Sequence, residues 1–374
     1  MRDAGSYIEG LWAWPLDAEM NEPFTIATGA KTEVNNVLVR LRLKDGTEGY
    51  GEGAPLSAFN GETQAKSLAA IKSQARFLIG RPIAGFRPLL ESLEERLGPR
   101  LGAAKAALGM AVLDAWCRRA RIPLRILFGG AQTRVFTDVT VTIGTPQEAL
   151  AAARRIVRLG VRTIKIKVGK DIEQDVERVR LIASASPRRR LFLDGNQGYT
   201  PRQSLRLLRR LKRHGITPIL FEQPAAKDDW EGLSDVYRLG KVPVAADESV
   251  TSRADAWRMA RERCAQVVNI KLMKSGLLEA WDIAHICRAA GLGLMVGGMV
   301  ESTLAMTCAA HFAAGLGGFP FVDLDTPLWF KRDPMRGMTI GRGGLYDLSA
   351  VKAGIGVVPL DKKYSLCYNL PTDR

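Results

Sequence analysis

Five short segments within residues 163–271 decide the fold: TIKIK at 163–167, LFLD at 191–194, LFE at 220–222, AAD at 245–247 and NIK at 269–271. Each is a mostly apolar run that ends in a charged residue, and these end residues follow one another at intervals of 27, 28, 25 and 24 residues. A strand, a helix and two loops take about that many residues, so the period indicates successive βα units. In a closed barrel of such units, the charged residues meet at the C-terminal rim, where active sites form.

The alternation of strand-like and helical runs extends on both sides of these segments. We expect residues 131–334 to form eight strands with seven intervening helices, a modified TIM barrel of the (β/α)7β type. The expected strands are Thr137–Ile143, Thr163–Val168, Leu191–Leu193, Pro218–Phe221, Val242–Ala245, Val267–Ile270, Gly293–Val296 and Phe319–Leu324. The expected helices include Pro146–Leu159, Asp171–Ala183, Pro201–His214 and Leu277–Ala290.

Residues 1–130 follow a different pattern, in which strands precede helices. Val37–Leu43 alternates in the manner of a strand, and Ile8–Trp14 and Phe24–Ile26 are further strand candidates. Helical spacing of apolar residues follows at Thr63–Ile79, Leu89–Leu97 and Ala103–Arg119. This order predicts an α+β capping domain, completed by residues from about 335–374 that return to pack on it.

The composition excludes several classes of protein. No apolar run reaches 18 residues, and the N-terminus lacks the apolar segment of a signal peptide. The five cysteines have no paired spacing, which favours reduced thiols. We therefore expect a cytoplasmic protein with no membrane partner, and the sequence is compatible with a homo-oligomer.

The net charge of +15 raises the alternative of a basic, nucleic-acid-associated protein. However, the arginine runs fall on segments expected to be outer helices or their loops. No aromatic residues are interleaved with them, as base stacking would require. We interpret the charge as a solvated surface and expect no nucleic-acid partner, so this function stays a remote alternative.

Two lysines end the second expected strand, and a third ends the sixth. Lys165 and Lys167 alternate along the strand and so point to the same side. Two adjacent ammonium groups lower each other's pKa, which suits a lysine that acts as a base near neutral pH. The other interpretation is the polar face of an exposed strand. Lys271 lies on the opposite side of the barrel, so two bases would face each other, as a racemase or epimerase requires.

Three carboxylates end the third, fourth and fifth expected strands. Asp194, Glu222 and Asp247 each follow an apolar run, and converging buried carboxylates need a counter-ion. Three oxygen ligands with open positions suit Mg²⁺, which keeps water or binds substrate. For any one of them the alternative is a helix N-cap, but three in successive units favour a metal site.

Together these motifs resemble the enolase superfamily, in its muconate-cycloisomerase-like branch, over nearly the whole chain. The matching motifs are Lys165-x-Lys167, Asp194-x-Asn196, Glu222-Gln-Pro224, Asp247-Glu248-Ser249 and Asn269-x-Lys271. The resemblance implies that Asp194, Glu222 and Asp247 hold Mg²⁺, which binds the substrate carboxylate. It implies further that Lys167 or Lys271 removes the α-proton, that the metal and Lys165 stabilise an ene-diolate, and that the other lysine returns a proton to the opposite face.

The branch includes cycloisomerases, o-succinylbenzoate synthases, N-acylamino-acid racemases and dipeptide epimerases. Asp323-Leu324-Asp325 is similar to the Asp-x-Asp of dipeptide epimerases, which binds the free α-ammonium of the substrate. Pairing of these aspartates with Lys331 or Arg332 is the alternative. The resemblance thus implies a Mg²⁺-dependent dipeptide epimerase with L-Ala-D/L-Glu as the leading substrate. An N-acylamino-acid racemase or an o-succinylbenzoate synthase is the rival.

The resemblance also suggests substrate contacts outside the charged set. Gly298, Met299 and Val300 match a segment that contacts the substrate backbone, and Thr140 matches a threonine that touches the substrate. The segment TIATGAKTE after Phe24 matches a mobile specificity loop. Lys31 within it stands where some Ala-Glu epimerases carry an arginine, although a solvated loop lysine is an equal interpretation. Glu301 is interpreted as an acidic residue at a helix start, not as a ligand.

Overall fold

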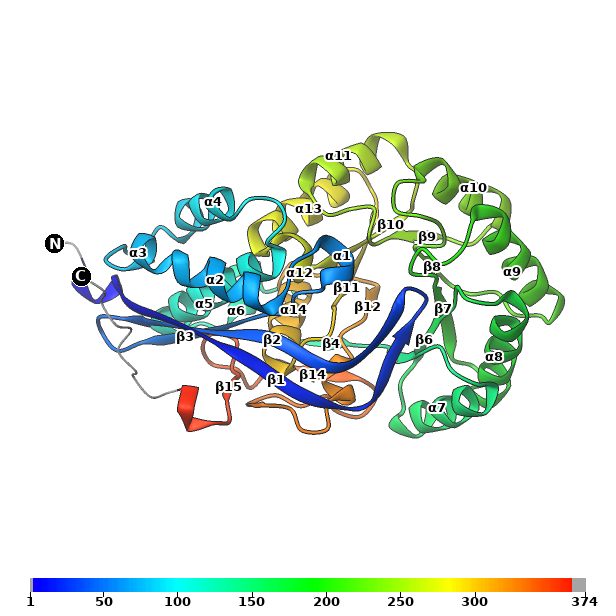
Figure 1. Ribbon diagram of the computed structural model, residues 1–374, viewed down its shortest axis with the longest axis horizontal. Coiled ribbons are helices and arrows are strands. Elements are labelled where there is room, and N and C mark those ends of the chain that lie inside the picture. The colour runs from blue at the N-terminus through cyan, green and yellow to red at the C-terminus, as the bar shows by residue number, and fades with distance from the viewer. Residues whose placement is uncertain (1–2, 365–374) are drawn as a thin grey trace.

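The computed structural model describes residues 3–364 and shows two parts side by side (Figure 1). The first part of the chain forms a three-stranded sheet with helices packed on it. The rest forms a curled parallel sheet with helices on its outside. The predicted fold class, a modified TIM barrel with an N-terminal α+β domain, is confirmed.

The N-terminal sheet is antiparallel, in the order β1 (Ile8–Ile26), β2 (Gly29–Leu43) and β3 (Glu48–Gly53). The sequence predicted two separate strands where the structure has the continuous β1. A register shift between Glu19 and Phe24 explains this, because it interrupts the alternation at the middle of the strand. The helices of this part are α1 (Ser57–Asn60), α2 (Gln64–Ser73), α3 (Ala75–Leu78), α4 (Phe86–Leu97), α5 (Gly102–Ala120) and α6 (Leu124–Leu127), after the 3-10 turn η1 (Ala4–Ser6).

Close packing of β3 on α5 depends on residues without bulky side chains. A Cβ added at Gly51 would lie 2.0 Å from the backbone oxygen of Ala107, and one at Gly49 would lie 2.2 Å from that of Ala111. The glycines recur every two residues along the strand and the alanines every four along the helix. Two residues of a strand span about the same length as four residues of a helix, so each glycine lies opposite an alanine. The helix backbone can therefore lie directly on the sheet.

The barrel strands lie in chain order, each parallel to the next, and seven connections on the outside join them. The strands are β5 (Val139–Val141), β6 (Thr163–Lys167), β7 (Arg190–Asp194), β8 (Phe221–Glu222), β9 (Val244–Ala246), β10 (Val267–Lys271), β11 (Gly293–Gly297) and β12 (Phe321–Val322). The helices are α7 (Pro146–Leu159), α8 (Ile172–Ala185), α9 (Pro201–Arg213), α10 (Trp230–Gly240), α11 (Arg253–Glu262), α12 (Leu272–Ser275), α13 (Leu277–Ala289) and α14 (Thr303–Leu316).

Local sequence explains where these helices begin. Thr145 and Thr200 each form a capping box, and proline follows directly as the first helical residue of α7 and α9. The apolar faces of both helices pack inward on the sheet. The expected helix bounds in this region agree with the structure to within two residues.

The first and last strands meet at a seam that closes the barrel. The backbone N–H of Asp138, directly before β5, donates to Val322 O at 2.9 Å. The N–H of Leu324 donates to Thr137 Oγ1 at 2.7 Å. Below the rim, an apolar cluster fills the interior, with Phe192, Leu220, Ala245, Val267 and Met295 as its buried members. The polar rim therefore lies above a solid core and not above a pore.

After the barrel, the chain returns along both parts of the molecule. It contains η2 (Thr326–Trp329), β13 (Met335–Arg336), β14 (Leu345–Asp347), β15 (Val358–Pro359) and η3 (Lys362–Tyr364), and β14 pairs with β4 (Arg134–Phe136). The N–H of Ile355 donates to Asp114 in α5 at 2.7 Å, and Arg40 in β2 donates to Tyr364 O at 3.2 Å. These bonds tie the last described residues to the first part of the chain.

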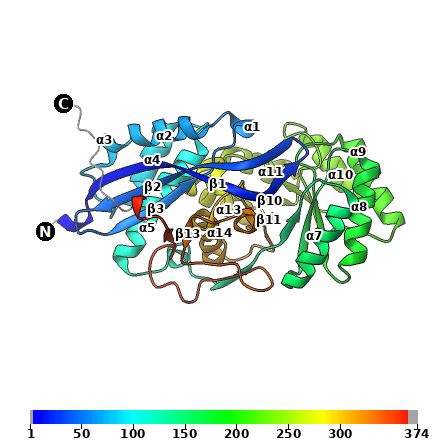
Figure 2. The ribbon, with the colours of Figure 1, turned by 60° about the horizontal axis from the view of Figure 1, so that its bottom comes forward.

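The β1–β2 hairpin extends from the N-terminal sheet across the barrel mouth (Figure 2). The sequence predicted a mobile loop after Phe24, but the strands continue to Ile26 and resume at Gly29. The hairpin contacts the barrel: Ile143 N–H donates to Thr25 O at 3.0 Å, and Arg155 ion-pairs with Glu22 at 2.8 Å. The segment is therefore a strand-paired hairpin tip in contact with the rim, and its mobility stays a prediction.

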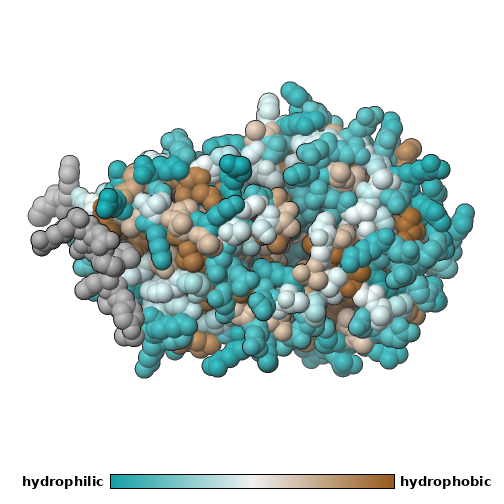
Figure 3. Space-filling view, viewed as in Figure 1, coloured by the Kyte–Doolittle hydropathy of each residue, from teal (hydrophilic) through white to brown (hydrophobic). Residues whose placement is uncertain are grey.

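Polar side chains cover most of the face seen in Figure 3. Within residues 3–364, no helix is both long and apolar enough to cross a membrane. Cys117, Cys264, Cys287 and Cys308 are free and buried, as reduced thiols should be. Cys367 lies outside the described residues.

Candidate active site

Parallel register brings the charged strand ends to one level. Lys167 pairs with Asp194 across β6 and β7, and Asp194 pairs with Glu222 across β7 and β8. Asp247 follows β9 by one residue. Lys271 ends β10, four strands from β6 in the sheet order and thus on the opposite side of the barrel. All five side chains are buried, so the structure brings together the residues that the sequence predicted for this site.

Lys165 and Lys167 point into the rim from β6. Lys165 Nζ lies 2.7 Å from Glu222 Oε2 and 3.0 Å from Asp194 Oδ2. Lys167 Nζ lies 2.6 Å from the same Asp194 oxygen. Lys165 is 0% exposed, so the interpretation as an exposed polar strand face is wrong for this residue.

Asp247 is held from the other side by two lysines. Lys271 Nζ lies 2.6 Å from Asp247 Oδ2, and Lys274 Nζ lies 2.9 Å from Asp247 Oδ1. Lys274 also donates to the backbone oxygens of Asp247 and Asn269, at 2.6 and 2.7 Å. Lys274 was not predicted from the sequence; it lies in the short helix α12, three residues after Lys271.

The pKa values of the lysines differ from the expectation that neighbouring ammonium groups lower them. Burial opposes the charge on Lys165, but Asp194, Asp323 and Glu222 outweigh it and raise its pKa well above the usual value. Burial likewise opposes the charge on Lys271, and Asp247 and Glu222 raise its pKa. The carboxylates at the rim therefore determine the charge of both lysines.

The same carboxylates form a cluster of buried acids that could bind a cation. Burial, and then the charge of Asp194, raise the pKa of Glu222 to about 8 despite the nearby Lys165. Asn196 Oδ1 accepts no hydrogen bond from any residue that the structure describes, and the Lys165 ammonium is the partner of Glu222 Oε2. Asp194, Glu222 and Asp247 bring buried carboxylate oxygens together, and in this structure lysine ammonium groups neutralise them. Oxygen ligands of this kind fit a hard divalent cation such as Mg²⁺.

The acidic pair after β12 faces the same mouth. Asp323 Oδ2 lies 2.6 Å from Lys165 Nζ. Asp325 Oδ2 accepts from Thr140 N–H at 2.7 Å and from Trp329 Nε1–H at 3.4 Å. Burial, and then the charge of Asp323, raise the pKa of Asp325 to about 6. Thr140 thus contacts Asp325 through its backbone, and the expected contact of its side chain stays a prediction.

The partners of this acidic pair differ from the alternative drawn from the sequence. Lys331 ion-pairs with Glu19 at 2.8 Å, not with Asp323 or Asp325. Arg332 is exposed. The ammonium group of Lys165 on β6, two strands from β12 across the seam, reaches Asp323.

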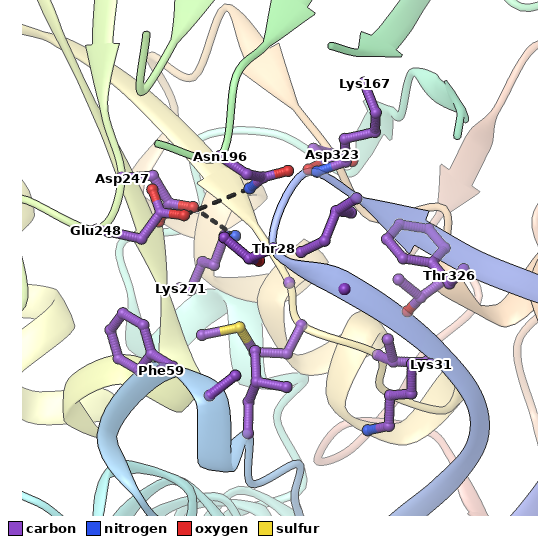
Figure 4. Close-up of a pocket in the computed structure, with 18 of the residues that line it drawn as sticks. Thr28, Lys31, Phe59, Lys167, Asn196, Asp247, Glu248, Lys271, Asp323 and Thr326 are labelled. Carbon is purple, nitrogen blue, oxygen red and sulfur yellow. Dashed lines mark hydrogen bonds and ion pairs between the residues drawn. The ribbon is translucent and has the colours of Figure 1, made fainter. Parts of the chain in front are cut away.

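A pocket of about 200 Å³ opens between the rim and the hairpin (Figure 4). Its polar wall holds Lys167, Asp247, Lys271, Asp323 and Asp325. The opposite wall comes from the N-terminal part and from the loop after β11. It consists of Phe24, Ile26, Thr28, Lys31, Leu56, Phe59, Gly298, Met299 and Val300. Lys31 lies on this wall (Figure 4), and burial lowers its pKa, so it is not simply a solvated loop lysine.

Two more acids near the pocket were not selected from the sequence. Glu248 lines the pocket, accepts from Asn196 Nδ2 at 3.4 Å, and has its pKa raised to about 7 by burial and by Asp247. Glu301 directly precedes Ser302, the N-cap of α14, in agreement with its interpretation as an acid at a helix start, and it is also buried beside Gly298. Burial raises its pKa to about 8. Glu248 stands within the matching motif Asp247-Glu248-Ser249, and its adjacency to Asp247 was the signal for its place.

The chain is similar to known proteins along most of its length. The family model described as mandelate racemase / muconate lactonizing enzyme, N-terminal domain, matches residues 15–129, and the one described as enolase C-terminal domain-like matches residues 148–363. An aromatic dipeptide epimerase of Herpetosiphon aurantiacus is 43% identical, over 94% of this chain and 98% of that protein. An L-Ala-D/L-Glu epimerase of Thermotoga maritima is 37% identical, over 87% of this chain and 94% of that protein.

A solved structure of a similar protein contains Mg and a dipeptide. The dipeptide epimerase of Enterococcus faecalis V583, complexed with Mg and the dipeptide L-Leu-L-Tyr, superposes with a TM-score of 0.88 at 34% identity. The match covers 94% of this chain and 99% of that one.

Proposed function

The chain belongs to the enolase superfamily, and from this premise we propose that it is a Mg²⁺-dependent dipeptide epimerase, an isomerase that inverts the α-carbon of the C-terminal residue. The observation that carries the proposal is the opposition of Lys167 and Lys271 across one pocket that also holds a cation site and an acidic pair. Relatives that cover most of the chain are named as dipeptide epimerases, which supports the same activity.

The residues that would hold Mg²⁺ are Asp194, Glu222 and Asp247. Their oxygen donors fit that ion, and a solved relative contains Mg beside a dipeptide. Bound there, the ion would supply positive charge to the substrate carboxylate and to the negative charge that develops as the α-proton leaves.

Lys167 and Lys271 are the proposed proton carriers. One takes the α-proton on Nζ, and the other donates a proton from its own Nζ to the opposite face of the carbon. Because the two lysines come from strands on opposite sides of the barrel, the carbon between them changes configuration. Lys165 is fully buried among three carboxylates, so we assign it a charge-stabilising role without proton transfer.

Asp323 and Asp325 are the proposed site for the free α-ammonium group of the dipeptide. Two carboxylates from one strand end, with backbone and indole donors fixing Asp325, form a site for a cation. We assign backbone contacts to Gly298, Met299 and Val300, and a substrate contact to Thr140. An N-acylamino acid or succinylbenzoate would bring no ammonium to this pair.

We propose L-Ala-D/L-Glu as the leading substrate, with Lys31 as the cation that faces the Glu side chain. Lysine offers a point charge without the bidentate geometry of arginine. The apolar side chains of Phe24, Leu56 and Phe59 on the same wall support a second candidate, a dipeptide with an apolar C-terminal residue. One relative is named an aromatic dipeptide epimerase and another an L-Ala-D/L-Glu epimerase.

Proton exchange in D₂O tests the activity. The purified chain is incubated with a dipeptide library and Mg²⁺, with a parallel sample in excess chelator, and α-deuterium is read by mass spectrometry. A gain of one mass unit, confined to a few dipeptides and abolished by the chelator, is the expected result. Exchange of N-acylamino acids in place of dipeptides would transfer the assignment to the rival racemase.

The variant Asp323→Asn separates these two activities within the same chain. It removes one negative charge from the ammonium site and should raise KM for dipeptides about tenfold or more, because hydrogen bonds between charged groups are the strong ones. A substrate without an ammonium group should be turned over at the original KM. An equal loss for both substrates would mean that Asp323 serves Lys165 and not the substrate.

A further inference from the structure

One buried acid at the barrel seam has no part in the reaction proposed above. Asp138 directly precedes β5 and is 3% exposed. Among the described residues, neither of its carboxyl oxygens accepts a hydrogen bond. A buried, ionised carboxylate without donors is strongly unfavourable, so the surroundings of Asp138 must allow it to be neutral or must supply a cation.

The surroundings of Asp138 are rich in acids and poor in cations. One oxygen each of Asp138, Asp323 and Asp325 lie within 4.8 Å of one another. The ammonium of Lys165 reaches this cluster at Asp323 Oδ2, 2.6 Å away, but it also ion-pairs with Asp194 and Glu222. A shared lysine cannot neutralise three acids.

A proton on Asp138 reduces the excess negative charge of the cluster. Burial and then the charges of Asp323 and Asp325 raise the pKa of Asp138 well above its usual value, against the opposing effect of Lys165. With Asp138 neutral, Asp323 and Asp325 contribute two negative charges. The α-ammonium of a bound dipeptide opposes them with one positive charge, and Lys165 adds a charge that it shares with Asp194 and Glu222. An ionised Asp138 would leave an excess negative charge in a buried site.

We propose that Asp138 is a positioning residue of the ammonium site: a neutral carboxylic acid that donates a hydrogen bond to Asp323 and so fixes the acidic pair for the substrate. The inference rests on the proposed function, which makes the dipeptide ammonium the ligand of Asp323 and Asp325. Asp138 stands behind these residues and not in the pocket wall, so it acts through them. A neutral acid also makes the cluster a poor second metal site, because metal ligands must be ionised.

Three variants separate the neutral donor from the alternatives. Asp138→Asn keeps a neutral donor of nearly the same shape, and Asp138→Ala removes the donor. Val139→Ala is the matched control: Val139 is 6% exposed in the same strand, and its side chain points to the other face. Melting temperatures of all three show how much of any effect is general loss of stability.

The first readout does not depend on turnover. Infrared spectra of the wild type at neutral pH should contain a carbonyl band of a protonated carboxyl group that is lost in Asp138→Asn and retained in Val139→Ala. Other buried acids contribute to both spectra and cancel in the difference. If the difference spectrum shows only the loss of a carboxylate, Asp138 is ionised and the proposal is overturned, whatever the activity.

The second readout is the division between KM and kcat for a dipeptide. Asp138→Ala should raise KM about tenfold with a smaller change in kcat, and Asp138→Asn and Val139→Ala should stay within about threefold of the wild-type KM. A tenfold rise in Asp138→Asn would mean that a charge, not a donor, is needed, and would overturn the proposal. The proposal would also be overturned if Asp138→Ala lowered the melting temperature and left KM unchanged. A wild type that exchanges no dipeptide would overturn the activity itself, and the infrared band would still decide whether Asp138 is neutral.

Discussion

Replacing either proton-carrying lysine by alanine should abolish inversion and leave proton exchange with one epimer intact. Lys167 and Lys271 come from β6 and β10, on opposite sides of the barrel, so each faces one side of the α-carbon. Lys167→Ala retains the base that faces one epimer, and Lys271→Ala retains the base that faces the other. Neither variant can complete the transfer across the carbon.

The size of the loss follows from the role of the missing group. A positioned general base contributes about 10²–10⁴-fold, which corresponds to about 3–5 kcal/mol of activation free energy. The carboxylates keep a second cation in both variants. Asp194 retains Lys165 at 3.0 Å, and Asp247 retains Lys274 at 2.9 Å, so the rim should stay folded and the loss should be confined to chemistry.

The assay follows α-deuterium incorporation separately in the L,L and L,D epimers of the most active dipeptide, by proton NMR in D₂O. Lys170→Ala is the control, because Lys170 is an exposed lysine in the loop after β6. The expected result is complementary: each variant exchanges one epimer near the wild-type rate and the other at least a hundredfold more slowly. The reasoning would be refuted by two variants that lose the same epimer, or by exchange of both epimers at the wild-type rate.

Three further predictions concern stability. Lys274→Met should lower the free energy of unfolding by about 3–5 kcal/mol in denaturant titrations, because the buried Lys274 ammonium holds the backbone oxygens of Asp247 and Asn269 as well as the Asp247 carboxylate. Gly51→Ala should cost about 1–3 kcal/mol by overpacking against Ala107, and an unchanged melting temperature would contradict the close approach of strand and helix. Burial lowers the pKa of His311 to about 4, so the folded state disfavours its protonation, and stability should fall by roughly 3 kcal/mol as the pH drops from about 6.5 to 4. His311→Gln should flatten that slope in melts taken across this range.

Most of the barrel could be predicted because short, local sequence patterns mark its strands and helices. Short apolar runs end in charged residues at a constant period, and threonine-proline pairs begin α7 and α9. The hairpin tip could not be predicted in this way. Its strands pair around Ala27 with few apolar residues, and its position depends on contacts with distant parts of the chain, such as that of Glu22 with Arg155. Tertiary contacts of this kind leave no period in the sequence.

The site shows the same division between local and distant information. Lys167 and Asp194 follow from strand register, and the structure brings them together as expected. The charge states of the lysines could not be predicted from strand register, because they depend on how many carboxylates surround each ammonium group. Lys274 and Asp138 were missed for a related reason. One belongs to a short helix and the other precedes a strand, so neither ends one of the apolar runs that identified the rest.

Lys165 connects the two halves of the proposed reaction site. Its ammonium contacts Asp194 and Glu222 on one side and Asp323 on the other, all within 3.0 Å. A residue so placed cannot give up its proton without leaving three buried carboxylates short of a cation, so it is poorly suited to proton transfer. It is well suited to coupling the sites, because a cation bound at Asp194 and Glu222 and an ammonium bound at Asp323 compete with the same lysine for partners. Occupation of either subsite should therefore change the affinity of the other by an equal factor. Calorimetric titration of Mg²⁺ with and without L-alaninamide, which carries the ammonium but no carboxylate, measures that coupling, and identical Mg²⁺ affinities would show that Lys165 serves the two groups independently.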